Sequence, residues 1–478
     1  MHAPLVVLGG GPGGYAAAFR AADGGLPVVL VESQPKLGGT CLLRGCIPSK
    51  SLLHVARVIA EAQELEAAGI RFGAPRIDLE ALRSHQERLI GKLTRGLDQL
   101  VKRRKVTRIV ARGRFQDSST LKLEGDHPSV PEGGRLTFDH CIVATGSVPA
   151  IPAALKCPSP RVIGSAGALQ LETLPSSLLV VGGGYIGLEM ATIYARLGCA
   201  VTVVEFTDQL LPGIDADLVK PVHRRLSELC DGGILLGSRV TTLTADDDSV
   251  TATVMTGGDQ LHALTFDRVL IAVGRRPNTK ELGLEHTHVE LDSDGFMLHD
   301  AQMRTADPRI LAIGDAAGQP MLAHKASHEG RIAAEVLLGE PAAFDVQAIP
   351  AVVFTDPEIA TCGLSESRAK AAGIAYETAL YPWAASGRAQ AVMRTDGMTK
   401  FLVDPSSKRV LGCGIVGAGA GELIAEAVLA MEMGATIEDV AESIHPHPTL
   451  SETLMHAGHA YMGTATEIYK PRRERKTG

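Results

Sequence analysis

Short runs of apolar residues that lead into glycine-rich turns set the pattern of the first part of the chain. Leu5–Leu8 has the character of a buried strand and runs into Gly9–Gly14, which opens an alanine-rich helical stretch. A second apolar run, Val28–Val31, ends at Glu32. This order of strand, Gly-x-Gly-x-x-Gly turn, helix, strand and acid predicts a dinucleotide site, in which the turn approaches a pyrophosphate and the acid binds a ribose hydroxyl. The glycines that the turn requires are Gly9, Gly11 and Gly14.

The same construction recurs farther along the chain. Leu178–Val181 precedes the turn Gly182–Gly187, and Val201–Val204 ends at Glu205. The spacing from the first glycine to the acid is the same in both copies, so we predict two dinucleotide-binding domains. A carboxylate at Glu205 favours a free 2′-hydroxyl and repels a 2′-phosphate, which predicts NAD(H) rather than NADP(H) at the second site. The glycines of the second turn are Gly182, Gly184 and Gly187.

The remaining pattern supplies connecting helices and a third domain. Apolar positions at helical spacing predict helices over residues 52–68 and from 79 to about 104. A strand ending in Thr145-Gly146 marks the point where the chain leaves the first domain, and Asp267–Pro277 is expected to be a strand that closes the second. From about residue 348, short strands alternate with helices, as in a separate α+β domain. The strands expected there are Ala351–Phe354, Thr399–Val403 and Val410–Val416, with a helix over Gly421–Met433.

One further buried-type strand, Ile310–Ile313, ends in Gly314-Asp315. If the chain returns there to the first domain, the carboxylate of Asp315 lies at the first nucleotide, where it can bind a polyol hydroxyl. The predicted fold class is therefore α/β, with two Rossmann-like domains and a C-terminal α+β domain.

Composition and charge narrow the classes of protein. A chain of 478 residues exceeds one ordinary core and predicts three or four domains, and 45% apolar residues are typical of a globular protein in water. A net charge of −7 gives no reason to expect nucleic-acid binding, and the basic stretch Lys470–Lys476 has the length of a frayed tail. No apolar run reaches the ~20 residues of a membrane span. The first strand begins too early for an export signal to precede it, so we expect a cytoplasmic protein.

Among the eight cysteines, Cys41 and Cys46 form the only close pair. On a regular helix this spacing puts the two Cα atoms roughly 8 Å apart, whereas a disulfide needs about 4.4–6.8 Å. A bridge therefore requires a turn or a distorted helix start, which Gly45 and Pro48 can supply. In a reducing cytosol a close pair is typical of redox or metal chemistry, and structural zinc would need a second close pair that the sequence lacks. We therefore expect no metal and a strained, labile, redox-active disulfide.

A histidine and a glutamate near the C-terminus are candidates for proton transfer. Thr449 followed by Glu452 is a capping-box pattern that predicts the start of the last helix. Alternatively, Glu452 orients His447 and raises the basicity of its imidazole. Both hold at once if each carboxylate oxygen serves one role. His324 and His328 have no metal-ligand neighbours in the sequence and are expected to be structural.

These motifs together resemble the flavoprotein disulfide reductases over essentially the whole chain, and within that family the dihydrolipoamide dehydrogenases. The most specific combination is the Cys-x4-Cys-x3-Lys run from Cys41 to Lys50 with the later His447–Glu452 stretch. The other motifs that carry the resemblance are Gly9–Gly14 with Glu32, Ala144–Gly146, Gly182–Gly187 with Glu189 and Glu205, Ala312–Asp315, Gln319–Lys325 and Tyr381–Arg388.

The resemblance implies a role for each matching position. It implies FAD at the first turn and NAD at the second. Cys41 is implied to exchange with a dihydrolipoyl substrate, Cys46 to lie next to the flavin, and Lys50 with Glu189 to form an ion pair beside it. The implied FAD contacts are Gly9, Gly11, Gly14, Glu32, Lys50, Thr145, Gly146 and Asp315, and the implied NAD contacts are Gly182, Gly184, Gly187, Glu205 and Gly274.

The resemblance also implies the assembly and the reaction. His447 and Glu452 are implied as an acid–base pair that reaches the disulfide from the other subunit of a homodimer. The implied activity is the oxidation of protein-bound dihydrolipoamide, with NAD⁺ reduced to NADH. The implied partner is the lipoyl-bearing acyltransferase of a 2-oxo acid dehydrogenase complex, with a glycine cleavage system as a further setting. The expected domains are 1–148 for FAD, 149–276 for NAD, 277–346 returning to the FAD domain, and 347–478 for dimerisation.

Two positions depart from the family pattern, and two other functions compete. Pro446 restricts the backbone before His447 and thereby affects the placement of the base. Tyr185 either covers the nicotinamide pocket or fills space between packed elements. A related reductase with another acceptor is the nearest rival, but Glu205 counts against NADPH, and the C-terminal cysteine pair of a mercuric reductase is absent. The other rival is an FAD-binding subunit that only scaffolds a larger complex.

Overall fold

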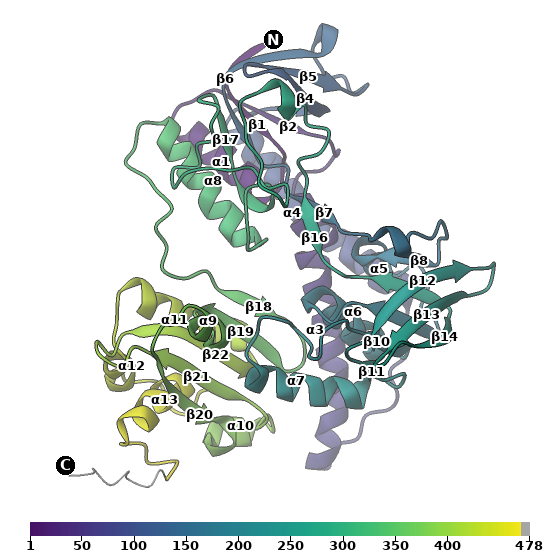
Figure 1. The fold of residues 1–478 in the computed structure, drawn as a ribbon, viewed down its shortest axis with the longest axis vertical. Helices are drawn as coiled ribbons and strands as arrows, with labels where there is room; N and C mark the ends of the chain where they lie inside the picture. The colour runs from purple at the N-terminus through teal and green to yellow at the C-terminus, as the bar shows by residue number, and fades with distance from the viewer. Residues whose placement is uncertain (470–478) are drawn as a thin grey trace.

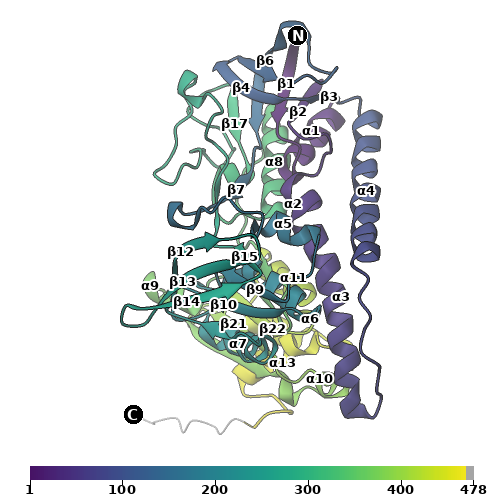
Figure 2. The same ribbon diagram turned by 90° about the vertical axis from the view of Figure 1, so that its right-hand side faces the viewer.

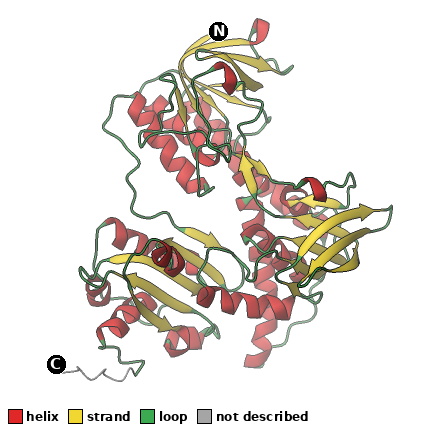
Figure 3. Cartoon of the chain, viewed as in Figure 1, coloured by secondary structure: helices red, strands yellow, loops and turns green. Residues whose placement is uncertain are grey.

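The computed structural model describes residues 1–469 and divides them among sheet-centred parts (Figures 1 and 3). The N-terminal part lies at the top of Figure 1, the second part at its right, and the C-terminal part below. The basic stretch that begins at Lys470 lies outside the described residues. None of the helices within 1–469 combines the length and the apolar character that crossing a bilayer requires.

The first part is built on a seven-stranded sheet with helices against it. Its elements are β1 (His2–Leu8), α1 (Pro12–Asp23), β2 (Val28–Glu32), β3 (Thr107–Val110), β4 (Arg112–Asp117), β5 (Thr120–Glu124), β6 (Arg135–Val143), β17 (Ile310–Ala312) and α8 (Ala323–Leu337). The strand order is β3-β2-β1-β6-β5-β4, and β17 pairs in parallel with β6. The chain thus returns to the first sheet after the second part. Helices α1 and α8 approach closely, because a Cβ on Gly330 would lie 2.4 Å from the Gly13 carbonyl oxygen.

The second part repeats this plan on a five-stranded parallel sheet. Its elements are β8 (Val162–Gly164), α5 (Ser165–Gln170), β9 (Ser177–Val181), α6 (Tyr185–Arg196), β10 (Ala200–Val204), α7 (Ala216–Leu229), β11 (Ile234–Leu235), β12 (Arg239–Ala245), β13 (Val250–Thr256), β14 (Gln260–Phe266) and β15 (Arg268–Ile271). The strand order is β11-β10-β9-β15-β8, and the separate antiparallel sheet β12-β13-β14 packs on one face. Continuous apolar runs such as β9 are buried on both faces, as parallel strands require.

Two short strands connect the first and second parts. β7 (Ser147–Pro149) pairs antiparallel with β16 (Arg275–Pro277). The single strand expected over Asp267–Pro277 is therefore wrong: β15 ends at Ile271 and β16 starts after Gly274. The reason is local, because Gly274 has φ +132°, a conformation that glycine adopts without strain and that interrupts the strand.

The C-terminal part is a five-stranded antiparallel sheet with helices, as the α+β prediction expected. Its elements are β18 (Ala351–Val353), β19 (Glu358–Gly363), α9 (Glu366–Ala371), β20 (Glu377–Pro382), α10 (Gly387–Ala391), β21 (Met398–Val403), β22 (Val410–Gly417), α11 (Ala420–Glu432), α12 (Ile437–Glu442) and α13 (Glu452–Met462). One face of the sheet packs on α11 and α13. The other face joins the core of the second part through residues such as Leu218 on α7 and Val416 on β22.

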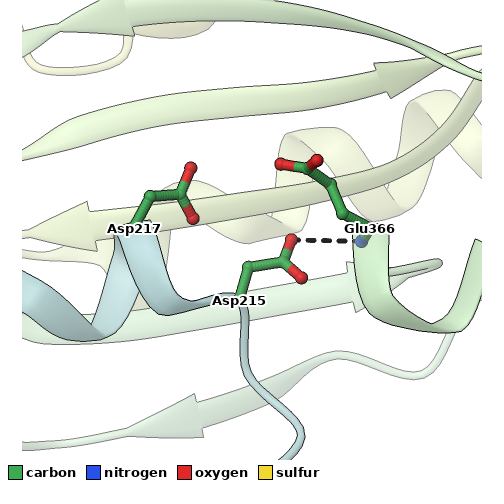
Figure 4. A group of neighbouring side chains, drawn as sticks. All are labelled: Asp215, Asp217 and Glu366. Carbon is green, nitrogen blue, oxygen red and sulfur yellow. Dashed lines mark hydrogen bonds between the residues drawn. The ribbon is translucent and has the colours of Figure 1, made fainter. Parts of the chain in front are cut away.

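A buried ammonium group reinforces the contact between the second and C-terminal parts. Lys400 on β21 is 1% exposed, and its Nζ lies 2.8–3.0 Å from carboxylate oxygens of Asp215, Asp217 and Glu366. Figure 4 shows these acids side by side, with Asp215 in the loop before α7, Asp217 on α7 and Glu366 at the start of α9. Burial alone would lower the pKa of Lys400, but these hydrogen bonds raise it to about 12. The acids therefore surround a protein cation, and Lys400 fixes α7 against the C-terminal sheet.

Three α-helices lie between β2 and β3 in the chain, and the first two carry the cysteine stretch. They are α2 (Gly39–Arg44), α3 (Cys46–Glu64) and α4 (Leu79–Arg103), and Figure 2 shows α3 and α4 running along one side of the molecule. The predicted range of α4 agrees with the structure within one residue, and Asp78 caps it by accepting a hydrogen bond from the Ala81 amide. The start predicted for α3 was wrong by almost two turns, because its first turn bears polar residues that face a cleft instead of a core.

Candidate functional site

A cleft of about 540 Å³ brings together segments from the first and second parts. Its wall includes the first glycine turn, the cysteine stretch from Gly39 to Lys50, and the Thr145–Ser147 segment. The second part contributes the start of α6, with Tyr185 and Glu189. The cleft is therefore bounded by the first glycine turn and by Tyr185 and Ile186 of the second, the two turns predicted to hold dinucleotides.

The first glycine turn fits a closely held pyrophosphate. Gly9 has φ +113°, and a Cβ on Gly14 would lie 1.8 Å from the Gly9 carbonyl oxygen, so a side chain at Gly14 is excluded. Glu32 fixes the turn from the end of β2, because its Oε2 accepts a hydrogen bond of 2.7 Å from the Gly10 amide. Its Oε1 accepts a second bond, of 2.8 Å, from the Gln34 amide. The acid is thus rigidly held at the edge of the cleft.

The second turn reproduces this geometry. Gly182 has φ +112°, and a Cβ on Gly187 would lie 2.0 Å from the Gly182 carbonyl oxygen. Glu205 accepts a hydrogen bond of 2.6 Å from the Gly183 amide through Oε2, and one of 2.8 Å from the Thr207 amide through Oε1. Gly184 caps the N-terminus of α6 with open space around its Cβ position, which leaves room for a ligand at that helix end.

The two cysteines sit on either side of a break between helices. Cys41 lies in α2, Cys46 begins α3, and Gly45 between them has φ −145° and ψ −111°. A Cβ on Gly45 would lie 2.9 Å from the Thr40 carbonyl oxygen, so the break depends on glycine. The predicted departure from a regular helix is therefore present. Both residues are free thiols in this structure, and their pairing as a disulfide stays a prediction.

The two thiols differ strongly in acidity. A hydrogen bond from Cys41, assisted by the positive charge of Lys50, lowers the pKa of Cys46 to about 7 although burial opposes this. The same hydrogen bond and burial raise the pKa of Cys41. The pair therefore begins to lose a single proton around neutral pH, and the Cys41 thiol donates its hydrogen bond to the thiolate on Cys46.

Lys50 is held between the cysteines and the second part. Its Nζ lies 2.9 Å from both oxygens of Glu189, a residue of α6 that is only 3% exposed. The ammonium also lies 4.5 Å from the centre of the Phe354 ring, and the Phe354 amide donates a hydrogen bond of 3.2 Å to Glu189. This ion pair thus joins all three parts at the wall of the cleft.

Asp315 lies in the same cleft, just beyond β17. Its Oδ2 accepts a hydrogen bond of 2.5 Å from the Ser147 hydroxyl, and Ser147 in turn contacts Arg275. Sequence reasoning selected Asp315 but missed Ser147 and Arg275. Thr145 also lies in the cleft wall, and its hydroxyl donates to the Asn278 carbonyl oxygen at 2.9 Å, which links the segments next to β7 and β16. Gly146 beside it has φ +71°.

His447 and Glu452 form a pair outside the cleft wall. The imidazole Nδ1 lies 2.9 Å from Glu452 Oε1, and the His447 side chain is 79% exposed. Partial burial disfavours the charged carboxylate, but hydrogen bonds from the Thr449 amide and His447 hold the pKa of Glu452 below its ordinary value. A base held by an ionised carboxylate, with its other nitrogen facing solvent, is suited to accept a proton from a molecule that docks against it.

The capping-box prediction was half wrong. The Glu452 carboxylate does accept a hydrogen bond of 2.8 Å from the Thr449 amide. The reciprocal bond is missing, because α13 begins at Glu452 itself and the Thr449 hydroxyl donates to the Pro446 carbonyl oxygen. Glu452 therefore serves both the backbone and His447, one through each oxygen.

Comparisons with known proteins identify the family. Residues 3–330 match the pyridine nucleotide-disulphide oxidoreductase model, and residues 349–458 match the model of its dimerisation domain. A dihydrolipoyl dehydrogenase of Vibrio cholerae serotype O1 is 45% identical over 476 residues, which cover 100% of this chain and 99% of that protein. One from Haloferax volcanii is 44% identical over 466 residues, 96% of each chain. The chain belongs to the dihydrolipoyl dehydrogenase family. The resemblance inferred from the motifs is confirmed.

Solved structures agree with this assignment. LpdA of Mycobacterium tuberculosis superposes with a TM-score of 0.86 at 28% identity, over 96% of this chain and 100% of that one. The flavoprotein disulfide reductase RclA of Escherichia coli, solved as a Cu(II) complex, superposes with a TM-score of 0.84 at 26% identity, over 96% and 99%. The predicted fold class is confirmed by the topology and by these neighbours. The family is one of FAD- and NAD-dependent enzymes whose C-terminal domain dimerises.

The remaining cysteines and the histidines His324 and His328 pack within the structure, whereas Tyr185 lies at the cleft. Burial raises the pKa of five further cysteines, which makes them poor nucleophiles: Cys141, Cys199, Cys230, Cys362 and Cys413. His324 contacts the Pro350 carbonyl oxygen at 2.8 Å, and His328 packs edge-on against Phe344. Tyr185 is 41% exposed at the cleft, so of its two alternatives the structure favours a cover over the cleft to core packing.

Lys50 is expected to add to the effect of the Cys41 hydrogen bond in lowering the pKa of the Cys46 thiol. In Lys50→Met the pKa of Cys46 should rise from about 7 toward its ordinary value, because the ammonium no longer favours the thiolate. Between the two values, the wild-type protein holds a thiolate that the variant lacks. The absorbance of the thiolate in the reduced protein, recorded as a function of pH, measures the midpoint of Cys46 ionisation. Lys280→Met removes another cation from the cleft wall and should leave the midpoint in place; an unshifted midpoint in Lys50→Met would contradict the assignment.

Proposed function

We propose that this protein oxidises protein-bound dihydrolipoyl groups to lipoyl groups and reduces NAD⁺ to NADH, with FAD as its resident cofactor. The observation that carries the proposal is the placement of the Cys41–Cys46 pair in the wall of a cleft that both glycine turns approach. A dithiol pair between two dinucleotide turns is the arrangement that a two-electron transfer from thiols to a nicotinamide needs. Full-length identity to dihydrolipoyl dehydrogenases supports the substrate.

The residues present fit FAD at the first turn. Gly9, Gly11 and Gly14 leave the backbone open to a pyrophosphate, and Glu32 presents a fixed carboxylate for the adenosine ribose. Asp315 offers a carboxylate to the ribityl chain, while Thr145, Gly146 and Lys50 line the same cleft. Bound there, FAD supplies a carrier that accepts two electrons and returns them as a hydride.

The second turn fits NAD for the same physical reasons. Gly182, Gly184 and Gly187 leave the N-terminus of α6 accessible to a pyrophosphate. Glu205 presents an anchored carboxylate to a free ribose 2′-hydroxyl. Gly274, just after β15, has open space at its Cβ position. A 2′-phosphate next to Glu205 would meet a fixed negative charge. This supports NAD over NADP as the exchanging nucleotide.

The protein side chains then act on the thiols and their protons. With Cys41 and Cys46 joined as a disulfide, His447 takes the proton of one substrate thiol, and the thiolate attacks the sulfur of Cys41. The Cys41–Cys46 bond breaks and a mixed disulfide forms. The second substrate thiol then attacks the substrate sulfur of that mixed disulfide and closes the lipoyl ring, and its proton passes to the departing Cys41 thiol. The charge of Lys50, fixed by Glu189, stabilises the thiolate left on Cys46.

We propose that His447 acts on the cleft of a partner subunit. It belongs to the C-terminal part, it lies outside the wall of this chain's own cleft, and its imidazole is exposed. The match of residues 349–458 to a dimerisation domain supports a homodimer in which the exposed pair faces the other subunit. The proposed setting is a cytoplasmic 2-oxo acid dehydrogenase complex, whose acyltransferase carries the lipoyl group. A glycine cleavage system offers the same chemistry. The domain ranges given above remain our proposal.

The decisive test is NAD-dependent oxidation of dihydrolipoamide by the purified holoprotein. The expected result is turnover with NAD⁺, with much weaker activity toward NADP⁺, because of Glu205. FAD bound without turnover would favour the scaffold subunit. Turnover only with another disulfide, such as glutathione disulfide, would favour the related reductase.

A further inference from the structure

A chain of hydrogen bonds connects Asp315 in the cleft to an arginine of the strand that leaves the second part. Ser147 Oγ donates to Asp315 Oδ2 at 2.5 Å. Arg275 Nε donates to the same Ser147 Oγ at 2.8 Å, and its Nη2 donates to the Ser147 carbonyl oxygen at 2.7 Å. Ser147 is 8% exposed, so the middle of this chain is shielded from water.

The direction of these bonds follows from the groups themselves. A guanidinium has N–H donors only, and an ionised carboxylate only accepts. The single proton of Ser147 must therefore point at Asp315, while its lone pair accepts from Arg275. The second bond from Arg275, to the Ser147 backbone, fixes the residue as well as its hydroxyl. Arg275 thus sets the orientation of the serine that holds Asp315.

Because of where Arg275 lies, this series of hydrogen bonds connects the first and second parts. Arg275 follows Gly274 at the start of β16, and it pairs with Pro149 of β7 across the connection between the two nucleotide domains. The Ala150 amide bonds the Gly274 carbonyl oxygen at 3.0 Å on the same edge. Arg275 lies in the wall of the cleft together with Tyr185 of the second part. Arg275, on the NAD side of this connection, therefore fixes the orientation of the Asp315 carboxylate on the FAD side through Ser147.

We propose that Arg275 is a positioning residue for FAD: through Ser147 it holds the Asp315 carboxylate in the orientation that binds the ribityl chain, and so couples flavin binding to the seating of the second domain. This rests on the proposed binding of FAD at the first turn. It predicts that Arg275 of β16, which follows the second glycine-rich domain, governs the affinity for FAD.

The test is a titration of the apoprotein with FAD, in which the quenching of flavin fluorescence reports binding. Arg275→Met should weaken FAD binding roughly tenfold to hundredfold, the range expected when a hydrogen bond to a charged group is lost. Arg275→Lys keeps a positively charged donor group without the guanidinium fork and should recover part of the affinity. Arg276→Met removes the neighbouring exposed arginine of the same strand and should bind as the wild type does.

A double-mutant cycle tests whether Arg275 acts on FAD binding through Ser147 (the relay) or directly through its own charge. Ser147→Ala should weaken FAD binding about as much as Arg275→Met, and the double variant should be little weaker than either single one. Additive losses would overturn the relay, because Arg275 would then act without Ser147. Wild-type affinity in both single variants would overturn the proposal while leaving FAD binding intact. A wild-type apoprotein that fails to bind FAD would instead overturn the proposed function, and this inference with it.

Discussion

Cys41→Ser is expected to retain FAD and to lose dihydrolipoamide turnover by roughly 10⁴-fold or more, the scale of losing a catalytic nucleophile. Serine has no sulfur to exchange with the substrate, so the first covalent step cannot occur. The fold should persist, because Cys41 lies on the short helix α2, is only half-buried, and is replaced by a side chain of similar size. NAD⁺-dependent dihydrolipoamide oxidation and the flavin absorbance of the purified variant measure the two properties.

Cys157→Ser offers a matched control, since Cys157 is also a half-buried free thiol. It lies outside the cleft wall and should leave turnover unchanged. Substantial lipoamide activity in Cys41→Ser would reject the exchange role assigned to Cys41. Loss of FAD from that variant would show that the substitution disturbed the cofactor site instead.

His447→Gln is expected to slow dihydrolipoamide oxidation by about 10²–10⁴-fold, the usual contribution of general acid–base catalysis. Glutamine keeps a hydrogen-bonding group near Glu452 but cannot accept the thiol proton. Reduction of the protein by NADH should change little, because it needs no proton from a substrate thiol. Rapid-mixing measurements of the two half-reactions separate these effects, and equal slowing of both would contradict an acid–base role.

His445→Gln provides the control for this variant. The His445 side chain is 7% exposed and contacts Glu426 at 2.8 Å, so its substitution perturbs the same loop without touching the proposed base. A stronger test uses mixed dimers of Cys41→Ser and His447→Gln protomers. If His447 serves the partner's cleft, one site in each mixed dimer is intact and activity reappears on mixing. If His447 serves its own cleft, both sites stay defective.

The sequence predicted those features that short, local patterns determine. The glycine turns at Gly9 and Gly182 and the acids Glu32 and Glu205 follow from fixed spacing, and the structure shows the same hydrogen-bond geometry twice. The break at Gly45 was predictable because two cysteines on a continuous helix lie too far apart to bond. The roles of these residues at bound cofactors remain predictions.

The features that were missed depend on contacts between distant segments. Ser147 and Arg275 are 128 positions apart, and no local pattern indicates that β7 and β16 pair. The start of α3 was missed because the polar first turn faces a cleft that only the fold creates. The Thr449 hydroxyl prefers the Pro446 carbonyl oxygen, and a four-residue motif does not reveal such a competitor.

The cluster around Lys400 has a consequence for motion within the dimer. Since a buried ammonium with three acid partners is costly to separate, the second and C-terminal parts are expected to move as one rigid body. The β7–β16 strand pair and the Lys50–Glu189 ion pair then connect this body to the first part. In the proposed dimer, a displacement of the second part would therefore carry His447 of the same chain with it.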